Sequence, residues 1–213
     1  MDKEDFIKRI VVGPLAVNCY LIGCGKTGEA AVIDPGDDAD EIAAAVRDAG
    51  VRPLYIINTH GHPDHVSANA DLKNEFGLEI VAHGLDSTLM QSGSDLLSLM
   101  GVRVIPSPPP DVTLEHGDTF WVGDIRLEVI HTPGHTEGGV CLYWREGRIL
   151  FTGDTLFAGG IGRTDFPGGS MRELERSIRE KLYSLPDDTV VLPGHGENST
   201  IGSEKSGNAF VRM

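Results

Sequence analysis

The segment that most constrains this chain spans residues 59–65 and reads Thr-His-Gly-His-Pro-Asp-His. Its side chains that can bind a metal ion are His60, His62, Asp64 and His65. The apolar run before it, Leu-Tyr-Ile-Ile at 54–57, predicts a buried strand. These side chains therefore follow the carboxyl end of a strand, where open α/β sheets place their functional sites.

The spacing of these side chains predicts two ions rather than one. Neutral imidazole is the commonest metal ligand, and Gly61 leaves the backbone free to aim His60 and His62 at one ion. Asp64 and His65 are adjacent and point in different directions, so the whole set does not suit a single tetrahedral centre. We expect Asp64 and His65 to serve a second ion close to the first.

Three later stretches end an apolar strand in the same way, with His135, Asp154 and His195 each beside a glycine. A single His or Asp after a strand is most often a turn or capping residue. The recurrence of the pattern predicts that several strand ends meet at one sheet edge around metal ions. The remaining histidines lack this combination of strand end and glycine and are interpreted as structural: His83, His116 and His131.

The composition narrows the partners and the compartment. Among 213 residues the formal net charge is −14, and no Lys/Arg-rich run is present, which argues against a nucleic acid partner. The cysteines, Cys19, Cys24 and Cys141, have no C-x-x-C spacing and predict free thiols in a reducing compartment. The N-terminus shows no apolar signal segment, and no apolar run is long enough for a membrane span. We therefore expect a cytoplasmic protein with no membrane partner.

The pattern of elements predicts an α/β fold. Strands are predicted at 10–12, 18–22, 30–34, 54–57, 79–83, 119–122, 125–130, 139–144, 148–152 and 189–192. Helices are predicted at 38–49, 64–76 and 170–184, with a looser helical region over 85–100 and a proline-rich connection at 106–110. Both halves combine hairpins with strand-to-helix units, so two mixed sheets packed face to face with helices outside would satisfy the pattern. We expect one domain over 1–213.

The chain resembles the metallo-β-lactamase superfamily. Its H-x-H-x-D-H signature is matched by residues 60–65, and the later motifs at 132–139, 151–157 and 193–196 also match in order. The resemblance implies an αββα sandwich with two divalent metal ions. It implies that His60, His62 and His135 bind the first ion, that Asp64, His65 and His195 bind the second, and that Asp154 bridges them. Such a ligand set suits zinc, and iron or manganese accept it as well.

The resemblance can be narrowed to one group. Asp154 stands where β-lactamases of the common two-zinc class carry a cysteine, which disfavours antibiotic hydrolysis. The stretches 153–157 and 162–169 are similar to the glyoxalase II group, the hydroxyacylglutathione hydrolases, and most of all to its short bacterial members. In that group a basic residue at the position of Arg163 lies near the glutathione moiety. Only 18 residues follow His195, so we expect no C-terminal helical glutathione-binding domain.

The resemblance implies hydrolysis of a glutathione thioester such as S-lactoylglutathione. Hydroxide formed at the metal pair would attack the carbonyl, with Asp64 and Asp154 as the catalytic carboxylates and Arg163 binding the substrate. One alternative is a persulfide dioxygenase with a single iron held by His60, His135 and Asp154. Another is a lactonase on the same two-metal site. The oligomeric state stays open.

Overall fold

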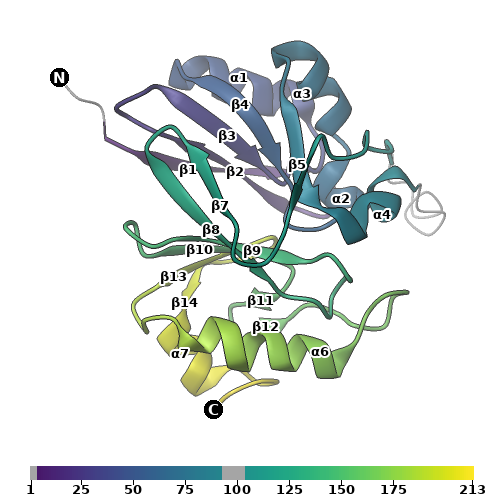
Figure 1. Ribbon diagram of the computed structural model, residues 1–213, viewed down its shortest axis with the longest axis vertical. Helices are drawn as coiled ribbons and strands as arrows, with labels where there is room; N and C mark the ends of the chain where they lie inside the picture. The colour runs from purple at the N-terminus through teal and green to yellow at the C-terminus, as the bar shows by residue number, and fades with distance from the viewer. Residues whose placement is uncertain (1–3, 93–103) are drawn as a thin grey trace.

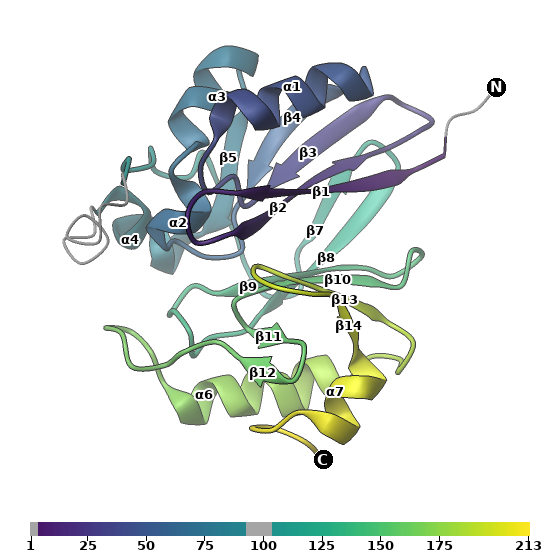
Figure 2. The ribbon, with the colours of Figure 1, turned by 180° about the vertical axis from the view of Figure 1, so that it is seen from behind.

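The structure is a computed structural model that describes residues 4–92 and 104–213. Two sheets lie face to face, and helices cover the outer face of each, so the molecule has four layers (Figure 1). The view from behind shows α1 and α3 on one outer side and α6 and α7 on the other (Figure 2). The predicted αββα arrangement of two mixed sheets is confirmed.

In the first sheet, neighbouring strands follow one another in chain order, from β1 to β6. They are β1 (Phe6–Val12), β2 (Val17–Gly23), β3 (Glu29–Ile33), β4 (Arg52–Ile57), β5 (Glu79–His83) and β6 (Val112–Leu114). β1 to β3 pair antiparallel, and β3 to β6 pair parallel. The parallel pairing brings the carboxyl ends of β3 and β4 to one edge.

The second sheet has the strand order β14-β13-β10-β9-β8-β7. Its strands are β7 (Thr119–Val122), β8 (Ile125–His131), β9 (Val140–Trp144), β10 (Ile149–Gly153), β13 (Val190–Pro193) and β14 (Ser199–Thr200). β10 and β13 pair parallel, and the other neighbours pair antiparallel. A separate small hairpin is formed by β11 (Leu156–Phe157) and β12 (Gly160–Ile161).

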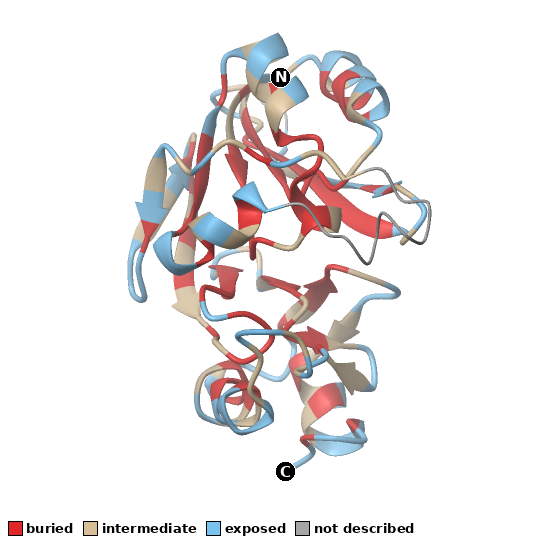
Figure 3. Ribbon diagram, turned by 90° about the vertical axis from the view of Figure 1, so that its right-hand side faces the viewer, coloured by how far each residue is buried: buried red, intermediate tan, exposed pale blue. Residues whose placement is uncertain are grey.

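The helices lie mainly on the outer faces of the two sheets. They are α1 (Ala39–Ala49), α2 (Pro63–Val66), α3 (Asn69–Phe76), α4 (Ser87–Gln91), α6 (Met171–Arg176) and α7 (Ile201–Gly207), with a 3-10 turn at Gly84–Asp86 before α4. Three apolar clusters fill the spaces between layers: one under α1 and α3, one between the sheets, and one under α6 and α7. Most of the inner strands are accordingly buried, while edge strands and the outer faces of the helices carry exposed residues (Figure 3).

The helix predicted at 64–76 is divided in two, which corrects that prediction. The Ala68 N–H donates to the carbonyl of Pro35 at 3.0 Å instead of continuing the helical hydrogen bonds. The Ser67 hydroxyl donates back to Pro63 O at 2.6 Å. α2 is therefore a single turn that packs against the loop after β3, and this turn carries Asp64 and His65.

The predicted helix at 170–184 begins as expected but changes its winding. Ser170 accepts from Glu173 N at 3.4 Å, as a capping residue does. The Ser170 N–H donates to Gly134 O at 2.7 Å, so it is not bonded to the Glu173 side chain. After α6 the chain continues as a π-helical stretch, Ser177–Lys181, and a 3-10 turn, Leu182–Ser184.

The sequence patterns missed β6, β11, β12, β14 and α7. Each is seven residues or fewer, too short for a distinct periodicity. Residues 104–110 carry no regular structure, as the prolines predict. Of the looser helical region at 85–100, the structure bears out α4, and residues 93–100 lie outside the described residues.

Candidate metal centre

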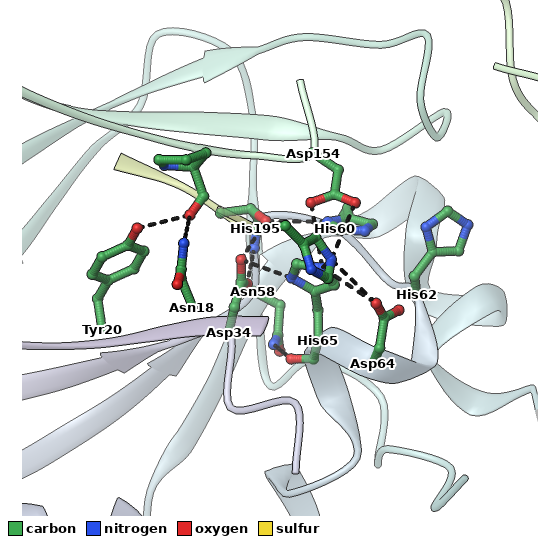
Figure 4. Close-up of polar contacts among 12 residues, drawn as sticks. Asn18, Tyr20, Asp34, Asn58, His60, His62, Asp64, His65, Asp154 and His195 are labelled. Carbon is green, nitrogen blue, oxygen red and sulfur yellow. Dashed lines mark hydrogen bonds and ion pairs between the residues drawn. The ribbon is translucent and has the colours of Figure 1, made fainter. Parts of the chain in front are cut away.

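The candidate ligands gather at the edge where the two sheets meet. His60 follows β4, Asp154 follows β10, and His195 follows β13. The Gly194 N–H donates to Gly153 O at 2.8 Å, which places the last two side by side. In Figure 4, Asp154 comes from one half of the molecule and faces His60, Asp64 and His65, which come from the other. The structure thus brings together all the side chains that the sequence singled out as ligands.

The first ligand group consists of His60, His62 and His135, which each offer a ligand atom within 4.8 Å of the others. His62 Nδ1 lies 2.8 Å from His135 Nε2. His62 is the residue before α2 and has extended backbone, and Pro63 opens the helix with its fixed φ. This change of backbone conformation separates His62 from the two candidate ligands that follow it.

The second ligand group consists of Asp64, His65 and His195, again with ligand atoms within 4.8 Å of one another. His65 Nε2 lies 3.3 Å from His195 Nε2, and His195 Nε2 lies 3.4 Å from Asp64 Oδ2. Asp64 and His65 both sit in the single turn of α2. One short helix thus presents two ligands to the same point.

Asp154 lies between the two groups. Its Oδ1 is 3.4 Å from His65 Nε2, and its Oδ2 is 3.6 Å from His135 Nε2 and 3.7 Å from His195 Nε2. Its position after β10 is close-packed, because a Cβ on Gly194 would lie 2.4 Å from Asp154 Oδ1. A carboxylate placed this way lies close to both ligand groups.

Hydrogen bonds fix which ring nitrogen each histidine offers. The Nδ1–H of His135 donates to Arg163 O at 2.7 Å, and that of His195 donates to Leu15 O at 3.0 Å. The Nδ1–H of His65 donates to Asp34 Oδ2 at 3.2 Å. Each of these rings therefore turns its Nε2 toward the centre, which is the usual arrangement for a metal-binding histidine.

His60 follows the same rule through a relay. The Thr59 hydroxyl donates to Asp34 Oδ2 at 2.6 Å, so its oxygen can accept from His60 Nδ1 at 3.2 Å. His60 Nε2 and Asp154 Oδ1 are buried without any hydrogen-bond partner. A buried polar atom without a partner is costly, and a metal ion satisfies both atoms. The donor set and these partnerless atoms fit a metal centre.

Electrostatics divide the histidines into two kinds. Burial, followed by repulsion from its histidine neighbours, lowers the pKa of His60 far below its usual range and that of His62 to about 3. Burial also opposes charge on His65, but Asp154 and then Asp64 outweigh it and raise the pKa of His65 to about 10. Burial disfavours the Asp64 carboxylate as well, but His65 and His195 outweigh it and lower its pKa. A cation that binds at the second group therefore displaces protons from it.

Asp34 is a site residue that the sequence analysis missed, because it was counted as the end of a strand. β3 ends at Ile33, and Asp34 adopts a left-handed backbone with φ of 51°. Its carboxylate accepts from the Thr59 N–H at 2.7 Å and from the Thr59 hydroxyl, and it holds His65. Its position after an apolar strand and before Pro35-Gly36 was the signal that could have identified it.

Two polar side chains from the first sheet hold the end of β13 in place. Tyr20 donates its hydroxyl to Pro193 O at 2.7 Å, and Asn18 donates Nδ2 to the same oxygen at 2.9 Å (Figure 4). Asn18 also donates to Gly196 O at 3.0 Å. The loop that carries His195 is thereby attached to the opposite sheet.

Arg163 touches the site through its main chain. Its carbonyl holds His135, while its guanidinium makes a two-bond ion pair with Asp165 at 2.8 and 2.7 Å. The guanidinium carbon lies 3.8 Å from the centre of the Phe166 ring, and that ring lies 5.6 Å from the ring of His62. The exposed side chain of Arg163 is therefore beside the metal centre but already has a partner.

The histidines interpreted as structural form a separate cluster. His83 and His131 stack with ring centres 4.4 Å apart, and His131 N donates to His116 Nδ1. Within the described residues, none of them belongs to a group with metal-binding geometry.

Cys141 is fully buried in β9, and burial raises the pKa of its thiol to about 11.

The four-layer fold and a His/Asp cluster at the meeting edge of its sheets are typical of the metallo-hydrolase superfamily. A model of the metallo-beta-lactamase superfamily matches residues 12–195, and the chain belongs to that superfamily. The resemblance recognised from the sequence is thereby confirmed.

The chain is similar over nearly its whole length to several proteins. It is 45% identical over 207 residues to an uncharacterized protein of Aquifex aeolicus, covering 96% of each chain. It is 38% identical to hydroxyacylglutathione hydrolase GloC of Haemophilus influenzae, covering 96% of this chain and 97% of GloC. It is 33% identical over 200 residues to the human mitochondrial persulfide dioxygenase ETHE1, covering 91% of this chain and 71% of ETHE1.

Solved structures share the fold. The BLEG-1 B3 metallo-beta-lactamase has a TM-score of 0.91 at 33% identity, covering 98% of this chain and all 100% of its own. TTHA1623 in a di-iron-bound form has a TM-score of 0.88 at 37% identity, covering 95% of this chain and 99% of its own. Within residues 4–92 and 104–213 the structure has no helix of the length and apolar character that spanning a membrane requires.

Proposed function

We propose that this protein is a two-metal hydrolase that cleaves thioesters of a small thiol such as glutathione. The position of Asp154 supports this most, because its oxygens lie 3.4 Å from His65 Nε2 and 3.6 Å from His135 Nε2, one on each side. A carboxylate between two ligand groups suits a pair of ions held close together. The similarity to GloC, a hydroxyacylglutathione hydrolase, supports a thioester as the substrate.

His60, His62 and His135 would hold one ion, and Asp64, His65 and His195 the other, with Asp154 shared. Imidazole combined with carboxylate suits zinc, iron and manganese alike. When bound, such a pair lowers the pKa of water toward neutrality and polarises a carbonyl oxygen.

The side chains of the protein prepare this chemistry. Asp64 is kept ionised by His65 and His195, so its carboxylate can accept a hydrogen bond from an attacking water and orient it. Asp34 and the carbonyls of Leu15 and Arg163 keep the histidine rings from turning. The leaving thiol has an ordinary pKa of about 8.5, so it departs as thiolate without a dedicated acid from the protein.

A shallow hollow lies beside Asp64. It is lined by the turn between β1 and β2, at residues 12–15, together with Gly36, Pro63 and Val104. Its walls are mostly apolar, and the carboxylate of Asp64 lies at its border. We propose that part of the thioester lies here while its carbonyl faces Asp154.

The test is hydrolysis of S-lactoylglutathione by metal-loaded protein and by the same protein after chelation. We expect turnover that chelation abolishes and that added metal restores. A simple lactone and a cephalosporin serve as counter-substrates, the latter because BLEG-1 is a B3 metallo-beta-lactamase. Turnover of either one in preference to the thioester, or full activity without metal, would contradict the proposal.

A persulfide dioxygenase is the second candidate. The similarity to human ETHE1 favours it, as does the position of His60, His135 and Asp154 at one side of the centre. The rings of His60 and His135 lie 4.8 Å apart, and His135 Nε2 lies 3.6 Å from Asp154 Oδ2. One iron per chain, with oxygen consumption on glutathione persulfide, would identify this activity. Two ions and no oxygen consumption would exclude it.

A further inference from the structure

Asp86 is a buried carboxylate that neither ligand group contains. It ends the 3-10 turn after β5 and is 2% exposed. It stands at the N-terminal boundary of α4, yet its side chain makes no capping bond to that helix. Its two oxygens are used elsewhere.

The carboxylate of Asp86 joins the two loops that carry the first ligand group. Its Oδ2 accepts from the Gly61 N–H at 2.9 Å, between His60 and His62. The same oxygen accepts from the Thr136 hydroxyl at 2.7 Å, and Oδ1 accepts from the Gly138 N–H at 2.7 Å, just after His135. One side chain thus binds both loops, which come from different halves of the molecule.

The glycines on either side show that the close approach is built into the sequence. A Cβ on Gly138 would lie 2.7 Å from Asp86 Cγ, and a Cβ on Gly61 would lie 2.9 Å from Asp86 O. Real side chains do not tolerate such distances, so both loops need glycine to reach Asp86. Gly61 stands between His60 and His62, and Gly138 stands three residues after His135.

We infer that Asp86 is a positioning residue that sets the distance between His60, His62 and His135 and so controls the affinity of the first metal ion. Buried charge-assisted hydrogen bonds to loop N–H groups are strong and directional. Asp34 has the corresponding role in the second group, because its carboxylate accepts directly from His65. It reaches His60 only through the Thr59 hydroxyl. Asp86 would then position the ligands of the first ion, and Asp34 would position a ligand of the second. This inference rests on the proposed two-metal site.

The test is metal titration of the variants Asp86→Asn, Thr136→Val and Asp34→Asn, with a chromophoric chelator as competitor and metal analysis of the loaded proteins. Asparagine has nearly the size of aspartate, but its amide nitrogen is a donor and cannot accept a hydrogen bond from a loop N–H group. We expect Asp86→Asn to weaken one ion by about 10- to 100-fold, as loss of an outer hydrogen-bond partner does. Thr136→Val, which removes only one of the hydrogen bonds, should weaken the same ion less. Anomalous scattering from crystals should show the loss at His60, His62 and His135, and for Asp34→Asn at His65.

Two results would overturn the inference. One is equal loss of both ions in Asp86→Asn, together with a lower melting temperature of the metal-free protein, which would indicate a purely structural role. The other is wild-type affinity for both ions in both Asp86→Asn and Thr136→Val. Wild-type protein that takes up no metal would contradict this inference and the proposed function together. Wild-type protein that binds two ions but cleaves no thioester would contradict the proposed substrate and leave the comparison of variants valid.

Discussion

His62 Nδ1 lies 2.8 Å from His135 Nε2, although 73 residues separate them in the chain and they come from different halves of the molecule. The Nδ1–H of His135 donates to Arg163 O, which leaves its Nε2 facing His62. Two ring nitrogens at this distance need a proton or a cation between them. Removing one histidine of this pair should therefore have a clear effect on metal binding.

Replacing His135 with alanine should remove one ion. We expect metal content to fall from two ions per chain to one, and the gain in melting temperature on adding metal to shrink, because ligand binding stabilises only the folded state. His116→Ala is the matched control, since that histidine is exposed and lies outside the ligand groups. A His135→Ala protein that still binds two ions with unchanged affinity would contradict the assignment.

Replacing Gly162 with alanine should disturb Asp154. A Cβ at this position would lie 1.8 Å from Asp154 O and 3.1 Å from His135 Nδ1, so the backbone that carries both residues must shift. Overpacking of this kind costs about 1–3 kcal/mol in the free energy of unfolding, and we expect weaker metal binding as well. Thermal unfolding and metal titration measure the two effects.

Gly160→Ala is the control for that substitution, because the nearest atom to its Cβ would be Phe157 Cβ at 3.9 Å. It lies in β12, two residues before Gly162, but should change neither stability nor metal affinity appreciably. Equal effects of the two substitutions would show that this segment is sensitive to any side chain and not to contact with Asp154.

Replacing Arg163 with alanine should raise KM for a glutathione thioester several-fold and change kcat less. The main-chain carbonyl that holds His135 remains in the variant, so the metal centre should keep its affinity. Asp165→Asn frees the guanidinium from its ion pair and should not raise KM. Both side chains are exposed, so the melting temperature should hardly change. An unchanged KM in Arg163→Ala would remove this side chain from the substrate site.

His83 should make stability depend on pH. Burial, and then repulsion from the stacked His131, lower the pKa of His83. In the unfolded chain His83 has a pKa of about 6.5, so below that pH it binds its proton more readily there than in the folded protein. This contribution to stability is therefore present above about pH 6.5 and is lost as the pH falls through that value toward the folded pKa.

The measurement is the free energy of unfolding of wild type and of His83→Gln between about pH 5 and 8. The difference in slope can reach at most about 1.4 kcal/mol per pH unit, the value for one proton. His116→Gln serves as the control, since His116 is exposed. Parallel curves for wild type and His83→Gln would refute the prediction.

The sequence determined the list of candidate ligands and the class of fold. His60, His62, Asp64 and His65 lie within one loop, and local spacing alone shows that they form a cluster. Asp154 and His195 were recognisable because each follows an apolar strand, and parallel strands bring their carboxyl ends to one edge. These inferences need only patterns of neighbouring residues, and such patterns can be read directly from the sequence.

Only the tertiary structure decided which partners hold those ligands. Asp34 and Asp86 contact residues 25 to 52 positions away, and no local pattern encodes such a distance. The division of the helix at 64–76 has the same origin, because the bond from Ala68 to Pro35 crosses between elements. Hydrogen-bond partners of buried polar groups depend on how the layers pack. The sequence alone therefore named the candidate ligands, and the packing of the two halves set their distances, their ring orientation and their charge.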